Sequence, residues 1–308
     1  MLAGLKDSTR CKYTNHYIGR TTDLKNNTEN RFPPEHCNAL FSALLVHDDI
    51  HLDASLPDQI HLDYSEEQLT RCYQISWQLW NDGMDPKGLR KILRNLYLRR
   101  PFTADDQIFF KHIRAKFKHL RCAYTTFDQR HSSPRGFHRM TAVMGYLQDA
   151  IKQGREDAAR WWAVALSVIL TKLPYELMIM PVNHFRPSTT ESFRAHVSEQ
   201  INSIRLCLLK TEITSKEFHE LRKIVSRQVA LYDNLKILYP SRYHSSISEY
   251  LSTINGMMGG MHDTLVVKKF DGSKSYYLDA VEMPADIRRR LVAYAERFAI
   301  SETLSSPA

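Results

Sequence analysis

Two groups of cationic side chains stand at helical spacing in this 308-residue chain, and phosphate binding is the chemistry that suits them. In the first group, Arg114, Lys118 and Arg121 occupy positions i, i+4 and i+7, so they would project from one face of a helix. Arg can hold phosphate oxygens through two parallel hydrogen bonds, while Lys supplies a point charge. Crowded cations repel one another, so such a face indicates a polyanion ligand; a solvated basic helix stripe is the alternative.

The second group lies about 105 residues further along the chain. His219, Arg222 and Lys223 occupy positions i, i+3 and i+4, and Arg227 extends the row by one turn. A lone His on a helix is more often structural, so the three neighbouring cations carry the prediction here. We therefore expect a second anion-binding face on this helix.

Charge is distributed unevenly along the chain. The whole sequence has a net charge of +8, from 42 Lys and Arg against 34 Asp and Glu. Residues 86–121 contain eleven Lys and Arg against two Asp, a local charge of +9, whereas residues 1–85 carry −6. A local excess of this size attracts phosphates and other anions.

The two cationic groups belong to an internal repeat. One stretch begins at Phe109 and the other at Glu217; each is a basic helical segment, a break at Pro134 or Pro240, and a second helical segment. Both second segments end in Met-Gly-x-x-x-Asp, at residues 144–149 and 258–263. We expect the closing Asp149 and Asp263 to cap or pack the helices, and the duplicated hairpins to be related by a pseudo-twofold axis.

These motifs resemble the CHAD family, the conserved-histidine α-helical domain, over about residues 102–265. The resemblance rests on His-x-x-Arg at His219 to Arg222, on Lys111 at the His position of the first copy with His112 beside it, and on the Gly-x-x-x-Asp endings. It implies an all-helical fold whose basic faces line a cavity that binds inorganic polyphosphate. Ser226 and Val229 stand where the family has basic residues, which weakens the second copy. The binding residues implied are Lys111, His112, Arg114, Lys118, Arg121, His219, Arg222, Lys223 and Arg227.

Hydrophobic periodicity predicts a mainly helical, all-α protein with an N-terminal extension over residues 1–64 and a helical domain over residues 65–300. The repeat copies within that domain are residues 102–153 and 214–265. Two runs rich in β-forming residues around Asp271-Gly272 predict a small C-terminal β-hairpin. The apolar residues from Trp161 to Ile169 are expected in the core. The expected helices are near 65–82, 86–99, 103–128, 135–153, 156–180, 188–210, 214–239, 243–263 and 284–300.

Two other functions fit parts of the sequence. The segment 86–100 mixes Arg with Leu and Tyr, as a helix that follows nucleic-acid phosphates and stacks on bases would, so RNA or DNA binding is the main alternative. Asp48, Asp49 and Asp53 resemble the Mg²⁺-holding aspartates of isoprenyl diphosphate synthases, although their spacing is one residue too long and no second such motif follows.

Other functional classes receive no support from the sequence. It contains no P-loop, no GxGxxG and no GxSxG, so we assign no catalytic residue, cofactor or metal site, and a binding protein is favoured over an enzyme. No apolar run is long enough for a membrane span, and the first residues lack a signal-peptide core. Five scattered cysteines without a CxxC favour a reducing, cytoplasmic location.

Overall fold

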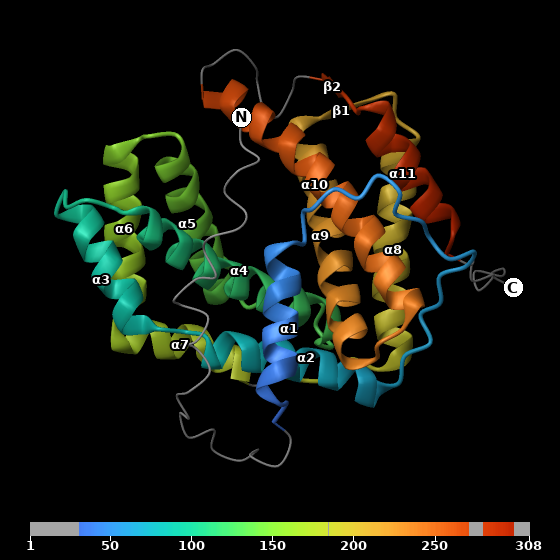
Figure 1. The fold of residues 1–308 in the computed structure, drawn as a ribbon, viewed down its shortest axis with the longest axis horizontal. Helices are drawn as coiled ribbons and strands as arrows, with labels where there is room; N and C mark the ends of the chain where they lie inside the picture. The colour runs from blue at the N-terminus through green and yellow to red at the C-terminus, as the bar shows by residue number, and fades with distance from the viewer. Residues whose placement is uncertain (1–30, 184, 271–279, 299–308) are drawn as a thin grey trace, which may run out of the picture. The chain divides into compact units, whose positions relative to one another are not determined.

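The structure, a computed structural model, describes residues 31–183, 185–270 and 280–298. Over these ranges the chain is mainly helical, which confirms the all-α prediction, and two short strands complete it (Figure 1). In chain order the elements are α1 (Pro34–Leu45), α2 (Glu66–Asp82), α3 (Pro86–Tyr97), α4 (Ala104–Phe127), α5 (Arg135–Lys152), α6 (Glu156–Ile169), α7 (Lys172–Asn183), α8 (Thr190–Leu208), β1 (Glu212–Thr214), α9 (Ser215–Leu238), α10 (Arg242–Phe270), β2 (Ala280–Glu282) and α11 (Ala285–Glu296).

The chain divides into two compact units, and each contains one copy of the repeat. Unit 1 comprises Met1–Phe41, Tyr73–Asp128 and Ser132–Arg186, and unit 2 comprises Ser42–Cys72, Gln129–His131 and Pro187–Ala308. The hairpin α4–α5 lies in unit 1 and the hairpin α9–α10 in unit 2. The described part of the expected extension over residues 1–64 is divided between the units and includes α1, a helix that the sequence did not predict.

An aromatic cluster forms the core of unit 1. The Trp80 ring meets Phe117 and Phe137 edge to face, with centroids 5.5 and 5.8 Å apart, and all three side chains are buried. Burial of such rings is the main source of stabilisation that positions α2, α4 and α5 of this unit. Tyr73 adds a directional bond, because its hydroxyl donates to the Val182 carbonyl at 2.6 Å.

The predicted single helix over residues 156–180 is two helices, α6 and α7, which meet at an angle of 75°. Pro174 accounts for the break. Proline tolerates the first turn of a helix, but in a continuous helix its ring would clash with the carbonyl four residues earlier and leave it without a donor. That carbonyl belongs to Leu170, and it accepts a hydrogen bond from Arg90 Nη1 at 3.1 Å instead.

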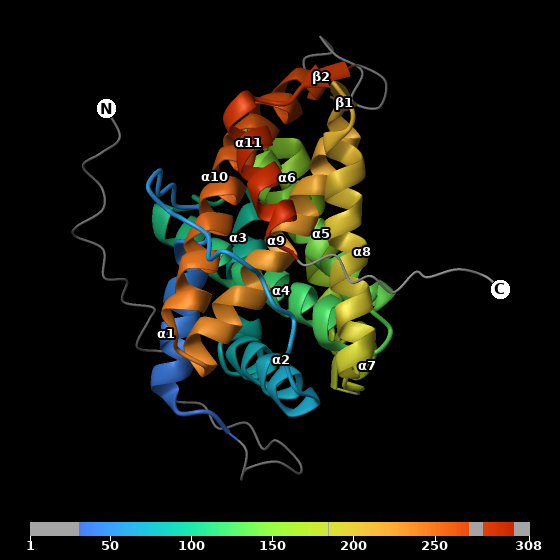
Figure 2. The same cartoon turned by 90° about the vertical axis from the view of Figure 1, so that its right-hand side faces the viewer.

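Helices α8 to α11 form the body of unit 2, and α9 and α10 lie antiparallel in it (Figure 2). Tyr232 and Tyr294 are fully buried between these helices. The Tyr294 hydroxyl donates to Gln228 at 3.2 Å, so this buried phenol retains a polar partner.

A small antiparallel sheet is present, but its strands are not those around Asp271-Gly272. Strand β1 pairs with β2, and Ile213 faces Val281. The first predicted strand, from Thr264 to Phe270, is the end of α10. Its β-propensity is overridden because apolar burial continues at helical spacing past Met258 to Leu265. The Asp271-Gly272 turn lies outside the described residues.

Among the described residues, no single helix has the length and apolarity to cross a bilayer. Helices α6 and α7 reach the length and apolarity of a membrane span only when the two helices, which are bent relative to each other, are taken together.

Candidate anion-binding site

The predicted row on α4 occupies one side of a well-capped helix. The Thr103 hydroxyl accepts from the Asp106 amide at 3.2 Å, and the Asp106 carboxylate accepts from the Thr103 amide at 3.0 Å, so two amides of the first turn are satisfied. Buried Phe110, Ile113, Phe117 and Leu120 fix one side of α4 in the core of unit 1. The opposite side carries exposed Lys111 and half-buried Arg114, Lys118 and Arg121.

The α4 row lies along α5. The Arg114 Nη2 atom is 3.4 Å from the point that a Cβ would occupy on Gly145, so this guanidinium group rests over the glycine. One turn earlier on α5, the Thr141 hydroxyl accepts a hydrogen bond from Arg121 Nη1 at 3.3 Å. The absent side chain at Gly145 and the small one at Thr141 let these long cationic side chains lie against α5 while remaining partly exposed.

His112 does not join this row, contrary to the prediction from the sequence. It is 9% exposed, packs edge-on against Phe41 with ring centroids 5.2 Å apart, and belongs to the core of unit 1. Burial, with smaller contributions from Lys116 and Lys111, lowers its pKa to about 4. His112 is therefore neutral at pH 7 and supports packing instead of anion binding.

Lys116 is a buried cation that the sequence analysis counted only as part of a basic segment. It is 3% exposed, its Nζ donates to the Gly83 carbonyl at 3.3 Å, and it lies 4.6 Å from the centroid of the Phe41 ring. Burial lowers its pKa to about 8. Its position four residues after His112, on the side of α4 that carries the phenylalanines, could have indicated from the sequence that Lys116 is buried.

The second row lies along α10 in the same way. The Arg222 Nη2 atom is 3.0 Å from the Cβ position of Gly259, a tighter fit than in the first copy. One turn further on α9, the Ser226 hydroxyl donates to Asn255 Oδ1 at 2.9 Å. Both contacts therefore follow the antiparallel register of the helix pair, and Ser226 stands at the position that Lys118 occupies in the first copy.

His219 is the other end of this row, and it stacks on His262 of α10. The ring centroids are 5.0 Å apart and the planes are inclined by 29°. The Nδ1 atom of His219 is buried and has no hydrogen-bond partner among the described residues. Burial is the largest cause, followed by Lys223 and His262, of a pKa lowered to about 4. His219 is therefore neutral at pH 7 unless an anion binds beside it.

The side chains of Lys223 and Arg227 bind to partners other than α10. Lys223 forms an ion pair with Glu220 at 2.7 Å, and Arg227 Nε donates to Gln200 of α8 at 3.4 Å. Gln200 in turn forms a hydrogen bond with the His196 ring. This ring stacks on His131 with centroids 4.1 Å apart. Its pKa is lowered to about 4, mainly by burial. The sequence analysis missed this histidine pair, because the two residues are 65 positions apart and share no motif.

The closing aspartates of the repeat are only partly described. Asp149 is half-buried in the last turn of α5, where its carbonyl accepts from the Gln153 amide at 3.1 Å. The side chain of Asp263 lies outside the described part of the structure. Their predicted packing role stays a prediction.

The acidic motif does not have the structure that a diphosphate synthase needs. Asp48, Asp49 and Asp53 lie in an irregular segment after α1 instead of on a helix. Hydrogen bonds from α10 side chains to main-chain carbonyls hold this segment to α10 within unit 2: Asn255 Nδ2 donates to the His47 carbonyl at 3.0 Å, and the Thr253 hydroxyl donates to the His51 carbonyl at 3.1 Å. The described residues contain no group of three metal-ligating side chains.

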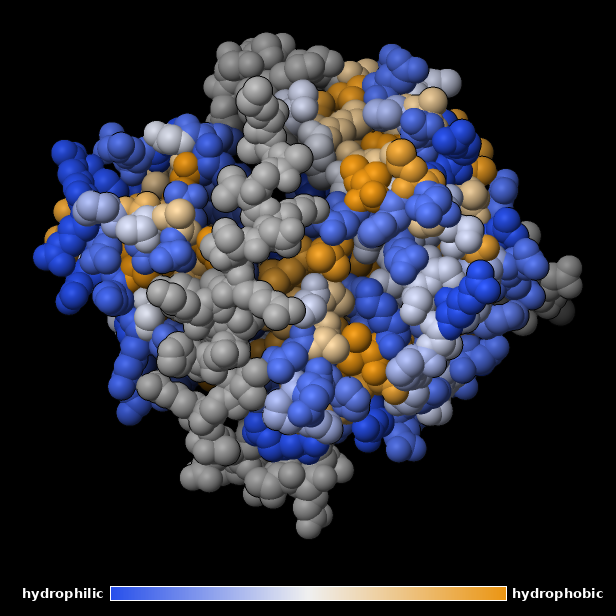
Figure 3. Space-filling view, in the orientation of Figure 1, coloured by the Kyte–Doolittle hydropathy of each residue, from blue (hydrophilic) through white to orange (hydrophobic). Residues whose placement is uncertain are grey.

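Helix α3 presents a third set of cations in unit 1. Leu89, Ile92 and Leu93 are buried, while Lys87, Arg90, Lys91 and Arg94 are exposed. Hydrophilic side chains cover this helix in the space-filling view (Figure 3). Tyr97, at the end of α3, is 37% exposed. This helix has the features that the nucleic-acid alternative requires.

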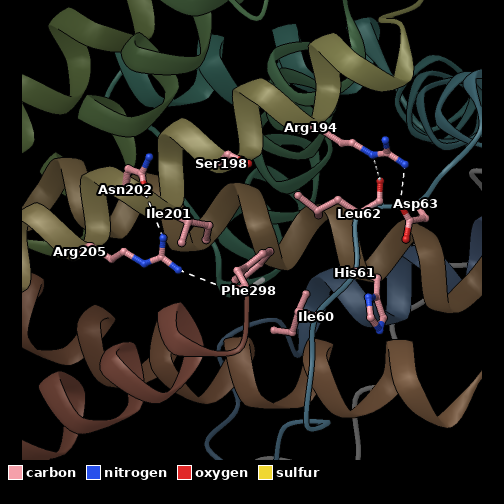
Figure 4. A pocket seen from close by; sticks show the side chains of 10 residues that line it. All are labelled: Ile60, His61, Leu62, Asp63, Arg194, Ser198, Ile201, Asn202, Arg205 and Phe298. Atoms are coloured by element: carbon pink, nitrogen blue, oxygen red, sulfur yellow. Dashed lines mark hydrogen bonds and ion pairs between the residues drawn. The ribbon is translucent and has the colours of Figure 1, made fainter. Parts of the chain in front are cut away.

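A pocket of about 300 Å³ lies in unit 2 (Figure 4). The segment Ile60–Asp63, helix α8 and Phe298 line it. Its two arginines are bonded to the walls: Arg194 pairs with Asp63 at 2.5 Å, and Arg205 donates to the Ala295 carbonyl at 2.8 Å. The pocket contains none of the predicted binding residues.

In comparisons with known proteins, no family model, no curated protein and no solved structure matches this chain.

Proposed function

We propose that this protein binds inorganic polyphosphate or a similar phosphate-rich polyanion through the basic faces of α4 and α9. One observation carries the proposal. In each unit, the arginine that leads the repeat lies over the glycine of the Met-Gly motif, Arg114 over Gly145 and Arg222 over Gly259. In both copies the guanidinium group lies beside this glycine, and the arginine remains half-buried.

Charge and packing support a polyanion as the ligand. Lys111, Arg114, Lys118 and Arg121 lie along one side of α4 within about 15 Å of helix, at a rise of about 1.5 Å per residue. Like charges this close raise the local potential, and a chain of linked phosphates neutralises several of them together. A single small anion would contact one or two, so a polymeric ligand suits the row better.

Half-burial strengthens the expected contacts. A hydrogen bond from Arg to phosphate is worth more where the guanidinium group is already oriented and partly desolvated, because less side-chain entropy is lost on binding. The Gly145 and Gly259 contacts provide this orientation in their respective units. The α9 row has fewer outward cations, since Ser226 bonds to Asn255 and Lys223 pairs with Glu220, so we expect it to bind more weakly.

The proposal is tested by measuring binding of the full chain to polyphosphate and to single-stranded RNA of equal charge, at one salt concentration. We expect polyphosphate to bind more tightly, and Arg114→Ala to weaken that binding more than Lys87→Ala does. Tighter RNA binding that is insensitive to Arg114→Ala contradicts the proposal.

RNA or DNA binding is the second candidate, and α3 favours it. Its exposed cations and the exposed Tyr97 combine phosphate contacts with a ring on which a base can stack. Under this candidate, Arg94→Ala and Tyr97→Ala weaken RNA binding, and the repeat arginines are nearly silent. Measuring the same variants against both ligands separates the two candidates.

A further inference from the structure

Many outward side chains of α6 and α7 are apolar, although the sequence predicted that the residues from Trp161 to Ile169, in α6, belong to the core. Trp161 is 62% exposed, and Val164 and Val168 are 48% and 59% exposed. These three residues stand at positions i, i+3 and i+7 of α6 and therefore form one stripe. Helix α7 carries Leu173, Leu177 and Met180 at i, i+4 and i+7, exposed by 66%, 58% and 52%, with one exposed acidic residue, Glu176, beside them. We call these six residues the α6–α7 apolar face.

Such a face requires an explanation. Single exposed apolar residues are normal, but three large ones in a stripe on each of two consecutive helices indicate an interaction site. The opposite sides of both helices are already buried, at Ala163 and Leu166 of α6 and at Met178 and Val182 of α7. The two helices are thus anchored in unit 1 by one side and present a second apolar side outward.

The lengths of the two helices exclude a span by either one. Helices of 14 and 12 residues are about 21 and 18 Å long, whereas a hydrocarbon core is about 30 Å thick. The bend of 75° at the break prevents them from acting as one rod. Short amphipathic helices with exposed Trp and Leu suit the boundary between headgroups and acyl chains.

Cations flank the break between α6 and α7. At this point Arg90 of α3, an exposed residue, donates a hydrogen bond to the Leu170 carbonyl at 3.1 Å. Lys172 is exposed at the start of α7. Helix α3, which packs on α6, adds exposed cations and has no acidic residue between positions 86 and 100. An apolar face beside a cationic helix is complementary to a surface that is apolar inside and negatively charged outside.

From this complementarity we infer that unit 1 docks on anionic lipid bilayers. The α6–α7 apolar face would enter the interface, and the α3 cations would lie against the anionic headgroups. The inference is independent of polyphosphate binding, because none of the six apolar residues belongs to the α4 or α9 row.

Two other occupants fit less well. Nucleic acid could bind the cations of α3, but its charged backbone would not bury the exposed Val and Leu side chains. In a twofold dimer built on this face, the α3 helices of both copies would lie near the interface, and their like charges would repel. An anionic bilayer satisfies the apolar and the cationic parts together.

The experiment is sedimentation of the full chain with phosphatidylcholine vesicles, with and without about 30% phosphatidylglycerol as the anionic lipid. The test variant is Trp161→Ser combined with Leu173→Ser and Leu177→Ser, which changes only exposed positions. The matched control is Leu206→Ser with Leu209→Ser, two leucines of unit 2 that are 64% and 81% exposed. A charge variant replaces Lys87, Lys91 and Arg94 by Gln. Circular dichroism verifies that each variant is folded.

We expect anionic vesicles to bind the wild type, the test variant to lose at least about tenfold in affinity, and the control to keep it. The charge variant should also weaken binding, and neutral vesicles should bind less. Equal binding of the wild type and the test variant overturns the inference, as does equal binding to neutral and anionic vesicles. Absence of vesicle binding with a wild-type dimer that the test variant converts to a monomer assigns the face to a second copy instead.

Discussion

The guanidinium group of Arg222 lies over Gly259, with Nη2 3.0 Å from the point where a Cβ would begin. Unit 1 contains the same relationship between Arg114 and Gly145, at 3.4 Å. The Cβ position of Gly259 is in tight contact with Arg222, so a side chain there would require the arginine to shift, whereas the contact at Gly145 has an ordinary van der Waals distance. Within each repeat copy, this relationship therefore links an arginine of the first helix to the Met-Gly motif of the second helix.

Gly259→Ala should weaken polyphosphate binding by up to about threefold, because a methyl group at 3.0 Å requires the Arg222 guanidinium group to shift by a few tenths of an ångström. Gly260→Ala is the matched control. No atom lies within 4 Å of its Cβ position, so this change should preserve binding and raise the free energy of unfolding by about 0.5–1 kcal/mol. Equal binding by the two variants would show that the glycine contact does not position Arg222.

Most of the helices could be predicted from the sequence. Capping residues such as Thr103 and Thr214 and breaks at proline locate α4 and α9 to within about two residues. The run from Thr264 to Phe270 could not, because its β-forming residues follow a helix whose burial pattern continues into them. A tertiary effect decided the structure there, and local propensity cannot reveal it.

The sequence predicted the candidate site only where the positions of its residues depend on the spacing within one helix. Helical spacing places Arg114, Lys118 and Arg121 on one side of α4, as the structure has them. The same reasoning does not separate Lys223, which pairs with Glu220, from Arg222, whose side chain lies against Gly259 of α10, because both fall near one face of α9. Nor does it show that His112 is buried by Phe41, which is 71 positions away.

Acid should destabilise the protein between about pH 6.5 and pH 4. Burial lowers the pKa values of His112, His196 and His219 to about 4, while the unfolded chain has the ordinary value of 6.5. Between these values the unfolded state binds more protons, so the free energy of unfolding is complete above pH 6.5 and falls as the pH drops toward 4.

Urea unfolding at several pH values measures this effect. His112→Gln removes one of the three protonations and should make the pH dependence shallower. An unchanged slope in this variant would show that His112 does not contribute to the pH dependence. A wild-type slope that is flat from pH 7 to pH 4.5 contradicts the prediction.

Polyphosphate binding should be accompanied by proton uptake at His219. A phosphate beside the ring favours the imidazolium form and raises the low pKa of the free protein, so affinity should increase as the pH falls from 7 to 5. Calorimetry at pH 6 in buffers of different ionisation enthalpy measures the protons taken up. His219→Gln should reduce the uptake; an unchanged uptake assigns the proton to another group.

Affinity for polyphosphate should fall steeply with salt. Each phosphate neutralised by Lys or Arg releases a counterion, and for single-stranded nucleic acid the log–log slope is about −0.7 per contact. Lys118→Ala should make the slope less steep by about one contact. A slope near zero in the wild type would indicate apolar recognition instead of recognition by the rows.

The most direct test compares polyphosphate affinity in Arg114→Ala, Arg222→Ala and Lys87→Ala at one salt concentration. Hydrogen bonds to charged groups are typically worth about 1.5–3 kcal/mol, so each repeat-arginine variant should bind on the order of tenfold to a hundredfold more weakly. Lys87→Ala, on α3, should bind nearly as the wild type does, and all three should remain folded. Equal, small losses in the three variants, or a dominant loss in Arg90→Ala, Arg94→Ala and Arg99→Ala, would contradict the assignment of binding to the α4 and α9 rows.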